Sequence, residues 1–317
     1  MVGIRKENEL RRRPERTLKK RLKKYWPLLL LASIPLVLVI VFNYSAYPGL
    51  RMVFMDYKPA MGFERSPWVG LEIFEDIFRN RDFFRALRNS IVFNILSLAV
   101  SFPAPIILAL MLNELRYPRF KKVSQTILYL PHFLSWVIIG SLAYSLFRPN
   151  TGLVNAMLMN WGLIDQGIPF LTEKTHWAVT YLLIGVWQGM GWGSIIYLAA
   201  LAGINGELYE AAMIDGANRW ERMLHITLPC IKGTIITLLI MNLGRLMGSN
   251  FEALQVFGNS QVREYQYQLA IFVYEKGLGN GQYSLSTAVN LFQSLVGLLL
   301  VLISDFVAKR LGEDGLL

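Results

Sequence analysis

Polar residues interrupt an apolar part of the chain, the run over residues 231–254. Ionisable side chains are costly at membrane depth, where they usually face a cavity or a partner. Asn242, Arg245 and Ser249 would share one face of a continuous helix, because they are spaced at i, i+3 and i+7. Such side chains can hydrogen-bond a polar solute or join neighbouring helices. The polar set is Asn242, Arg245, Ser249, Asn250 and Glu252.

A second candidate site lies in a polar interval between two long apolar runs. Gly216 has no Cβ, so it can adopt a positive φ and end a first short helix. Asn218 can cap a second short helix, with Glu221 three residues later as in a capping box. Pro229 suits the first turn of the long helix that follows. The segment reads Glu210, Ala211, Ala212, Met213, Ile214, Asp215, Gly216 and Ala217.

A short helix–turn–helix with apolar side chains, held between two membrane spans, favours docking of a soluble partner. The alternative is a surface or re-entrant hairpin that only links the spans. Its sequence resembles the EAA loop of the membrane subunits of type I ABC importers, because Glu210, Gly216 and Pro229 have the family's spacing. The triplets Glu-Ala-Ala and Asp-Gly-Ala and the run Ile-Thr-Leu-Pro over 226–229 also match.

The resemblance implies that this loop is the coupling helix, which docks into a cleft on a cytoplasmic ATPase. Glu210 would meet a basic residue of the ATPase, and Gly216 would set the bend. Ala211, Ala212 and Met213 would fill the cleft. Asp215 and Ala217 complete the expected coupling set.

Sequences near the C-terminus look like the carbohydrate-uptake branch of the family, especially LplB-type polysaccharide permeases, a group that includes alginate importers. They are Gly-Gln-Tyr-Ser over 281–284, Ala-Val over 288–289, and Lys-Arg-Leu-Gly-Glu over 309–313. The resemblance implies a second permease subunit, which would make a heterodimer, and an extracytoplasmic solute-binding protein that delivers an oligosaccharide. It also implies two cytoplasmic ATPase subunits, which would bind the ATP and Mg.

In the resembling family the span that matches 231–254 lines the translocation path. We therefore expect Arg245 and Asn242 to contact a hydroxyl-rich sugar, which could be acidic, as alginate or its oligomers are. Ser249 and Asn250 belong to the same expected path, and Trp192 and Tyr197 are aromatic candidates. Two alternatives stay open: Arg245 could pair with Glu252 or with a carboxylate of a partner subunit, and the aromatic residues could be packing or interfacial groups.

Composition limits the class of protein that can hold these sites. The chain has 317 residues, 54% of them hydrophobic, and a mean hydropathy of +0.37, which indicates a polytopic membrane protein. Eleven basic residues precede Trp26, which fits a cytoplasmic flank that contacts membrane lipid rather than nucleic acid. One cysteine and three scattered histidines suggest no metal site, and we expect no cofactor in this chain.

Six apolar runs are long enough for membrane helices, since a hydrocarbon core of about 30 Å needs about 20 helical residues. We therefore expect an all-α membrane protein with six spans and the MetI-like fold of type I importer permeases. The basic loop over 113–122 indicates that both termini are cytoplasmic, at the inner membrane of a bacterium. The expected spans are 26–47, 90–112, 123–147, 177–204, 231–254 and 285–308.

The expected organisation follows from these spans. The chain would have a cytoplasmic tail over 1–25, a first membrane helix over 26–47 and an extracytoplasmic segment over 48–87. A permease core over 88–308 would contain the coupling loop 205–229, and 309–317 would form a second cytoplasmic tail.

The sequence fits two other function classes less well than it fits an ATP-driven importer. An ion-gradient-driven secondary transporter would need buried carboxylates or broken helices at mid-membrane, which the sequence offers sparingly. A membrane-embedded enzyme would need a cluster of nucleophile, base or metal ligands, and we expect no catalytic residues. No phosphate-binding loop of the GxxxxGK[ST] type is present, so the energy source must lie in another subunit.

Overall fold

The computed structural model describes residues 18–313, 315 and 316. Most of the expected N-terminal tail, residues 1–17, lies outside the described residues. The described chain is helical apart from turns, loops and one isolated antiparallel bridge between Met55 and Trp68. It forms two compact units, residues 1–52 and 53–317.

The first unit is built on the expected first membrane helix. It contains α2 (Leu18–Val39), the π-helical turn η1 (Ile40–Tyr44) and most of the 3₁₀ segment η2 (Tyr47–Phe54). Pro27 and Pro35 lie inside α2 without ending it. The apolar side chains of α2 and η1 are exposed, with Leu31 of α2 at 69% and Phe42 of η1 at 72%, as expected of a helix whose surroundings are hydrocarbon.

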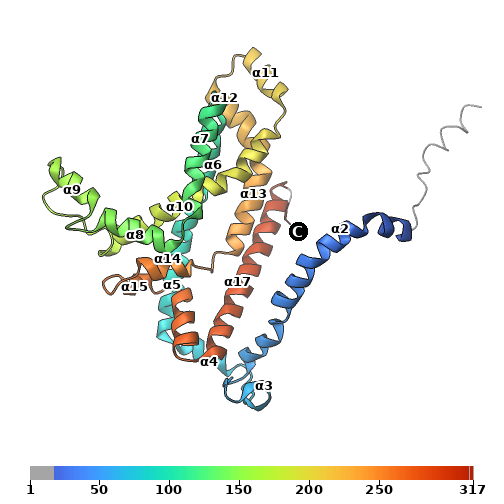
Figure 1. The fold of residues 1–317 in the computed structure, drawn as a ribbon, viewed down its shortest axis with the longest axis vertical. Helices are drawn as coiled ribbons and strands as arrows, with labels where there is room; N and C mark the ends of the chain where they lie inside the picture. The colour runs from blue at the N-terminus through green and yellow to red at the C-terminus, as the bar shows by residue number, and fades with distance from the viewer. Residues whose placement is uncertain (1–17, 314, 317) are drawn as a thin grey trace, which may run out of the picture. The chain divides into compact units, whose positions relative to one another are not determined.

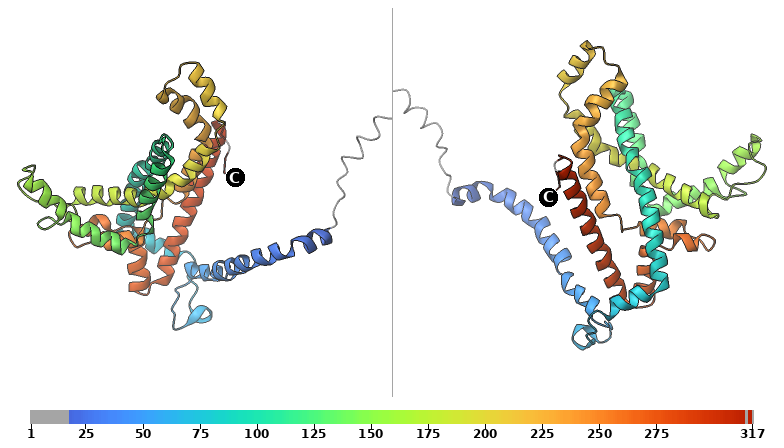
Figure 2. Two further views of the ribbon diagram at one scale, coloured as in Figure 1. Left: turned by 45° about the horizontal axis from the view of Figure 1, so that its top comes forward. Right: turned by 180° about the vertical axis from the view of Figure 1, so that it is seen from behind.

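The second unit packs long helices against one another (Figure 1). α10 packs against α5 and α6. α13 lies along α17, as the two views of Figure 2 show. Gly191 allows a close approach of α10 to α7, because a Cβ there would lie 2.0 Å from the Leu128 carbonyl oxygen. A fully buried core forms around Phe83, Trp177 and Phe272.

The helices of this unit, in chain order, are as follows. They are α3 (Gly62–Arg65), α4 (Glu72–Arg79), α5 (Arg81–Ser101), α6 (Pro103–Asn113), α7 (Pro118–Tyr129), η3 (Leu130–Phe133), α8 (Trp136–Phe147), α9 (Leu153–Asn160), α10 (Lys174–Ala202), α11 (Gly206–Ile214), α12 (Arg219–Arg222), η4 (Met223–Thr227), α13 (Leu228–Gly244), α14 (Phe251–Phe257), α15 (Arg263–Gln266), α16 (Leu269–Val273), η5 (Tyr274–Gly279) and α17 (Tyr283–Arg310).

Five helical stretches among the described residues are long and apolar enough to cross a membrane, and a bent pair could supply a sixth. The bent pair corrects the expected continuous span over 123–147, because it turns by 102° between Phe133 and Trp136. Ser135 caps the start of α8 there, accepting a hydrogen bond from Ile138 N at 3.4 Å. The second span also begins earlier than expected, at Arg81.

The fifth span is likewise different from the expectation. It reaches back to Arg219 and ends at Gly244, whereas a continuous helix over 231–254 was expected. Residues 245–250 connect α13 to α14 without regular helix, and we call them the connecting segment. The expected common face of Asn242, Arg245 and Ser249 is therefore wrong, because Ser249 lies beyond the end of the helix.

Candidate functional site

The coupling segment, residues 205–229, folds locally as its sequence predicts. Gly216 has a φ of +83° and follows the end of α11. The Asn218 side chain accepts from Glu221 N at 3.0 Å, while the Glu221 carboxylate accepts from Asn218 N at 2.7 Å. This capping box starts α12, and Pro229 lies in the first turn of α13. Figure 1 shows α11 and α12 together at one end of the unit.

The coupling segment exposes several large apolar side chains. Ile214 is 87% exposed and Trp220 71% exposed. Exposed apolar groups gathered in one place are typical of a protein interface. At the base of the segment the Tyr209 and Thr227 hydroxyls lie 2.9 Å apart, which ties α11 to the start of α13. Of the expected coupling residues, Ala212 and Ala217 are half-buried and the other five are exposed: Glu210, Ala211, Met213, Asp215 and Gly216.

The expected substrate-path residues meet at a second place. A cavity of about 480 Å³, which we call the central pocket, is lined by Trp192 and Tyr197 of α10 and by Asn242 and Arg245 at the end of α13. Four of the six expected residues therefore lie together. Further polar groups come from α5, η3 and α10, and they are Asn94, Ser97, Ser101, His132 and Gln188.

Among the described residues, Arg245 is the only Lys or Arg side chain that lines the central pocket, and no Asp or Glu of this part of the chain lines it. Within the part of the chain that the structure describes, no carboxylate is in ion-pair contact with Arg245, so the alternative pairing with Glu252 does not occur. Glu252 lies in the first turn of α14 and is exposed.

Ser249 and Asn250 lie outside the central pocket. The Ser249 hydroxyl donates to Gln268 Oε1 at 2.7 Å. Asn250 caps α14, with its side-chain oxygen accepting from Ala253 N at 3.0 Å. Both residues thus position the connecting segment and the helix after it.

Comparison with known proteins gives these two sites a context. Residues 101–313 match the family described as "binding-protein-dependent transport system inner membrane component". The chain belongs to this family.

Two curated relatives and two solved structures are similar over most of this permease. LplB of Bacillus subtilis (strain 168) is 42% identical, over 92% of the permease and 91% of that protein. The polygalacturonan/rhamnogalacturonan transport system permease YteP of the same organism is 41% identical, over 93% of the permease and 90% of that protein. One chain in a crystal structure of a bacterial ABC transporter, which is involved in import of the acidic polysaccharide alginate, is 36% identical, with a TM-score of 0.81. The match covers 92% of the permease and 98% of that chain.

A second structure of a bacterial alginate ABC transporter, in complex with an alginate pentasaccharide-bound periplasmic protein, matches with 35% identity and a TM-score of 0.82. The match covers 94% of the permease and 99% of that chain. The permease is thus the membrane-spanning subunit of a binding-protein-dependent ABC transporter, in the bacterial inner membrane. This assignment replaces the ion-gradient and enzyme alternatives, and the family carries no cofactor itself.

Sequence reasoning missed all five of these further polar residues of the central pocket, and two of them make contacts that shape it. Asn94 Nδ2 donates to the carbonyls of Leu246 and Gly248, at 2.7 and 3.0 Å. His132 lies in η3, its ring stacked on Trp192, and its Nδ1 is buried without a hydrogen-bond partner in the described part of the permease. The sequence signal for His132 was its place after Pro131, at the break between α7 and α8, but nothing in the sequence linked it to Trp192.

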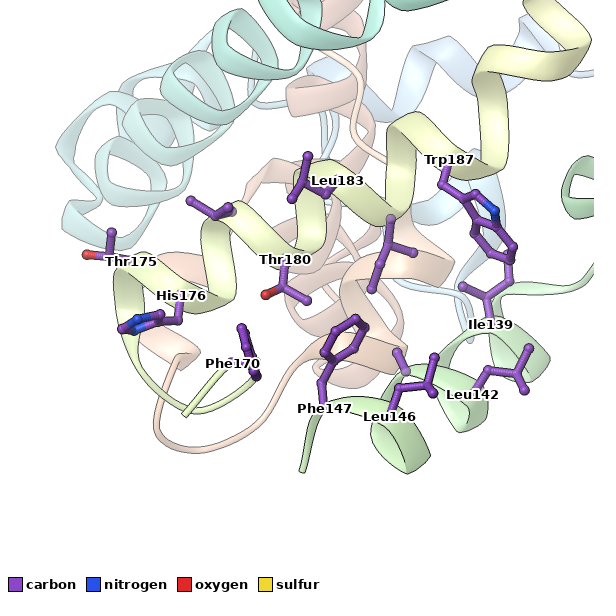
Figure 3. Close-up of a pocket in the computed structure, with 13 residues that line it drawn as sticks. Ile139, Leu142, Leu146, Phe147, Phe170, Thr175, His176, Thr180, Leu183 and Trp187 are labelled. Atoms are coloured by element: carbon purple, nitrogen blue, oxygen red, sulfur yellow. The ribbon is translucent and has the colours of Figure 1, made fainter. Parts of the chain in front are cut away.

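Another cavity has a different character. This apolar pocket, of about 510 Å³, lies between α8 and the first half of α10 (Figure 3). Leu142, Leu146 and Leu183 line it, with Thr175 and His176 at one end. His176 hydrogen-bonds to Glu173, and this bond holds the pKa of the Glu173 carboxyl below its usual value. An apolar lining is unsuited to a hydroxyl-rich solute.

Proposed function

We propose that this permease imports acidic oligosaccharides, and that the acidic group passes Arg245 in the central pocket. The observation that carries the proposal is a guanidinium in a polar cavity whose lining has no carboxylate. A guanidinium binds carboxylates through paired hydrogen bonds. The amides of Gln188 and Asn242 each keep one N–H donor beside an oxygen acceptor, and Asn94 keeps its Oδ1 acceptor, because its two N–H groups bond to backbone carbonyls. These groups match sugar hydroxyls. The alginate importer named above, which handles an acidic polysaccharide, supports the same substrate class.

The proposal includes partners that complete the path. Asn242, Arg245 and Trp192 are exposed although they line the pocket, so a second permease subunit is needed to enclose the solute. A heterodimer is proposed, with a solute-binding protein at the outer face. Two ATPases with ATP and Mg would sit beneath the coupling segments, and both chain ends would be cytoplasmic. Movement of the coupling segments would then alternate the access of the central pocket between the two sides.

The test compares Arg245→Ala with Arg245→Lys in the full transporter, reconstituted in vesicles with saturating loaded binding protein. Loss of a charge-assisted hydrogen bond costs about 1.5–3 kcal/mol, so Arg245→Ala should lower uptake of an acidic oligosaccharide by about 10- to 100-fold. Uptake of a neutral oligosaccharide of the same length should change little, and Arg245→Lys should restore part of the acidic uptake. Arg88→Ala, an exposed residue on α5 outside the pocket, is the matched control.

Equal losses for acidic and neutral sugars would overturn the acidic-substrate proposal. So would full activity of Arg245→Ala. Basal ATP hydrolysis, measured in the same vesicles, shows that each variant is folded and assembled.

A further inference from the structure

We propose that a second pocket, adjoining the central pocket at Gly248, is a neutral sugar-binding subsite that holds the next units of the oligosaccharide chain. This inference rests on the proposed function, because it assigns a further part of the same substrate. The second pocket has a volume of about 490 Å³. It lies among the connecting segment, α14, α16, η5 and α17.

The lining of the second pocket has the chemistry that a sugar needs. Its polar side chains are uncharged hydroxyls and amides, supplied by Ser249, Tyr274, Ser286, Asn290 and Gln293. Phe251 and Tyr274 add aromatic surface, and their ring centroids lie 4.8 Å apart. Hydroxyl groups both donate and accept hydrogen bonds, as amide and hydroxyl side chains do, whereas the apolar C–H faces of a sugar ring suit aromatic rings.

The two pockets differ in charge, and this difference would determine which part of the substrate each pocket binds. The central pocket contains Arg245, whereas no charged side chain of the residues that the structure describes lines the second pocket. A carboxylate therefore meets a cation in the central pocket, whereas the second pocket offers it only uncharged hydroxyl and amide groups. Hydroxyl-bearing portions of the chain can be bound in both.

Gly248 lies between the two pockets, because it belongs to the lining of each. The connecting segment around it is held from both sides: Asn94 of α5 bonds to the carbonyls of Leu246 and Gly248, and Gln293 of α17 donates to the Met247 carbonyl at 2.8 Å. The backbone between the pockets is thus fixed, and the smallest residue lies where the pockets meet. A chain of sugars could occupy both pockets across this point, whereas a short sugar would fit in the central pocket alone.

The test measures how initial uptake depends on the length of the sugar. In the reconstituted transporter, initial uptake is measured with saturating loaded binding protein for an acidic disaccharide and for a pentasaccharide that extends the same disaccharide by three neutral units. Asn290→Leu removes an exposed amide from the second pocket, and it should lower pentasaccharide uptake by about fivefold, since a lost hydrogen bond is worth about 1 kcal/mol. Disaccharide uptake should change by less than about twofold.

Gly248→Ala supplies an independent variant. Gly248 is not in the left-handed region, and an added Cβ would meet only the Arg245 carbonyl oxygen, at an ordinary 3.4 Å, so the variant should fold. Its methyl group narrows the junction and should likewise slow the pentasaccharide selectively. The control is Ser294→Leu, one turn from Asn290 on α17, exposed and outside both pockets.

The outcomes separate the two proposals. If Asn290→Leu and Gly248→Ala leave the pentasaccharide rate unchanged, or slow both sugars equally, the second subsite is wrong. That result leaves the Arg245 proposal standing as long as Arg245→Ala still discriminates acidic from neutral sugars. If Arg245→Ala fails to discriminate while Asn290→Leu remains selective for length, the acidic specificity is wrong and the second subsite is retained for a neutral chain.

Discussion

The His132 imidazole lies flat against the Trp192 indole, with ring centroids 4.8 Å apart and an interplanar angle of 6°. The two residues come from η3 and α10, and both line the central pocket. Phe133 meets the Trp192 ring edge-on at 5.7 Å and limits its movement. The stack therefore gives the pocket a rigid aromatic wall next to its polar groups.

This stack leads to a prediction about the unpaired nitrogen of His132. The His132→Phe variant keeps an aromatic ring against Trp192 and removes a buried Nδ1 that has no partner among the described residues. An unsatisfied buried polar atom costs about 1–3 kcal/mol, so the variant should unfold at a higher temperature than the wild type. If the other ring nitrogen contacts the sugar, uptake should fall at the same time. Higher stability with unchanged uptake would show that His132 only supports Trp192.

Two asparagines on α5 provide a matched pair. Asn94 bonds to two carbonyls of the connecting segment, whereas Asn89 bonds to the carbonyls of Glu264 and Tyr267, at 2.7 and 2.9 Å. Substitution of either by Ala leaves two carbonyls without their donor, and each should lower the free energy of unfolding by about 1–3 kcal/mol. We expect only Asn94→Ala to reduce substrate uptake. If Asn94→Ala and Asn89→Ala lowered both uptake and stability to the same extent, the connecting segment would have no specific role in transport.

Substrate-stimulated ATP hydrolysis should depend on the backbone at Gly216. Proline fixes φ near −65°, which is incompatible with the +83° found there, so Gly216→Pro should distort the turn between α11 and α12. We predict that it abolishes stimulation by loaded binding protein and leaves membrane insertion intact.

Gly206→Pro is the control for that variant. Gly206 is the first residue of α11, where proline is well tolerated, and Asn205 before it is extended with a ψ of 124°. This change introduces the same residue into the same segment and should preserve stimulation. Normal stimulation by Gly216→Pro would count decisively against docking of the coupling segment on the ATPase.

Close packing of α10 can be tested with two glycines of that helix. A Cβ at Gly191 would overlap the Leu128 carbonyl, whereas a Cβ at Gly185 meets nothing within 4 Å. Gly191→Ala should therefore destabilise the permease by about 1–3 kcal/mol through overpacking. Gly185→Ala should stabilise it by about 0.5–1 kcal/mol, because Ala favours the helix. Thermal unfolding of the purified permease distinguishes the two, and similar shifts would contradict this packing.

The sequence by itself determined the features that depend on neighbours within a few residues. The turn at Gly216 and the capping box of Asn218 and Glu221 follow from local backbone chemistry. The long apolar runs identified the membrane helices, because span length follows from bilayer thickness. The resemblance of the coupling segment to the EAA loop led to the family that the comparisons show.

Only the tertiary structure decided where the polar residues lie. Arg245 and Ser249 were placed on one helix face by spacing, but the helix ends at Gly244, and the carbonyls beyond it are bound by Asn94, some 152 and 154 residues away in sequence. No local pattern contains such a hydrogen bond. His132 likewise lines the pocket because the chain bends after η3 and its ring stacks on Trp192 of α10. A cavity is formed by elements that are close in space but far apart along the chain.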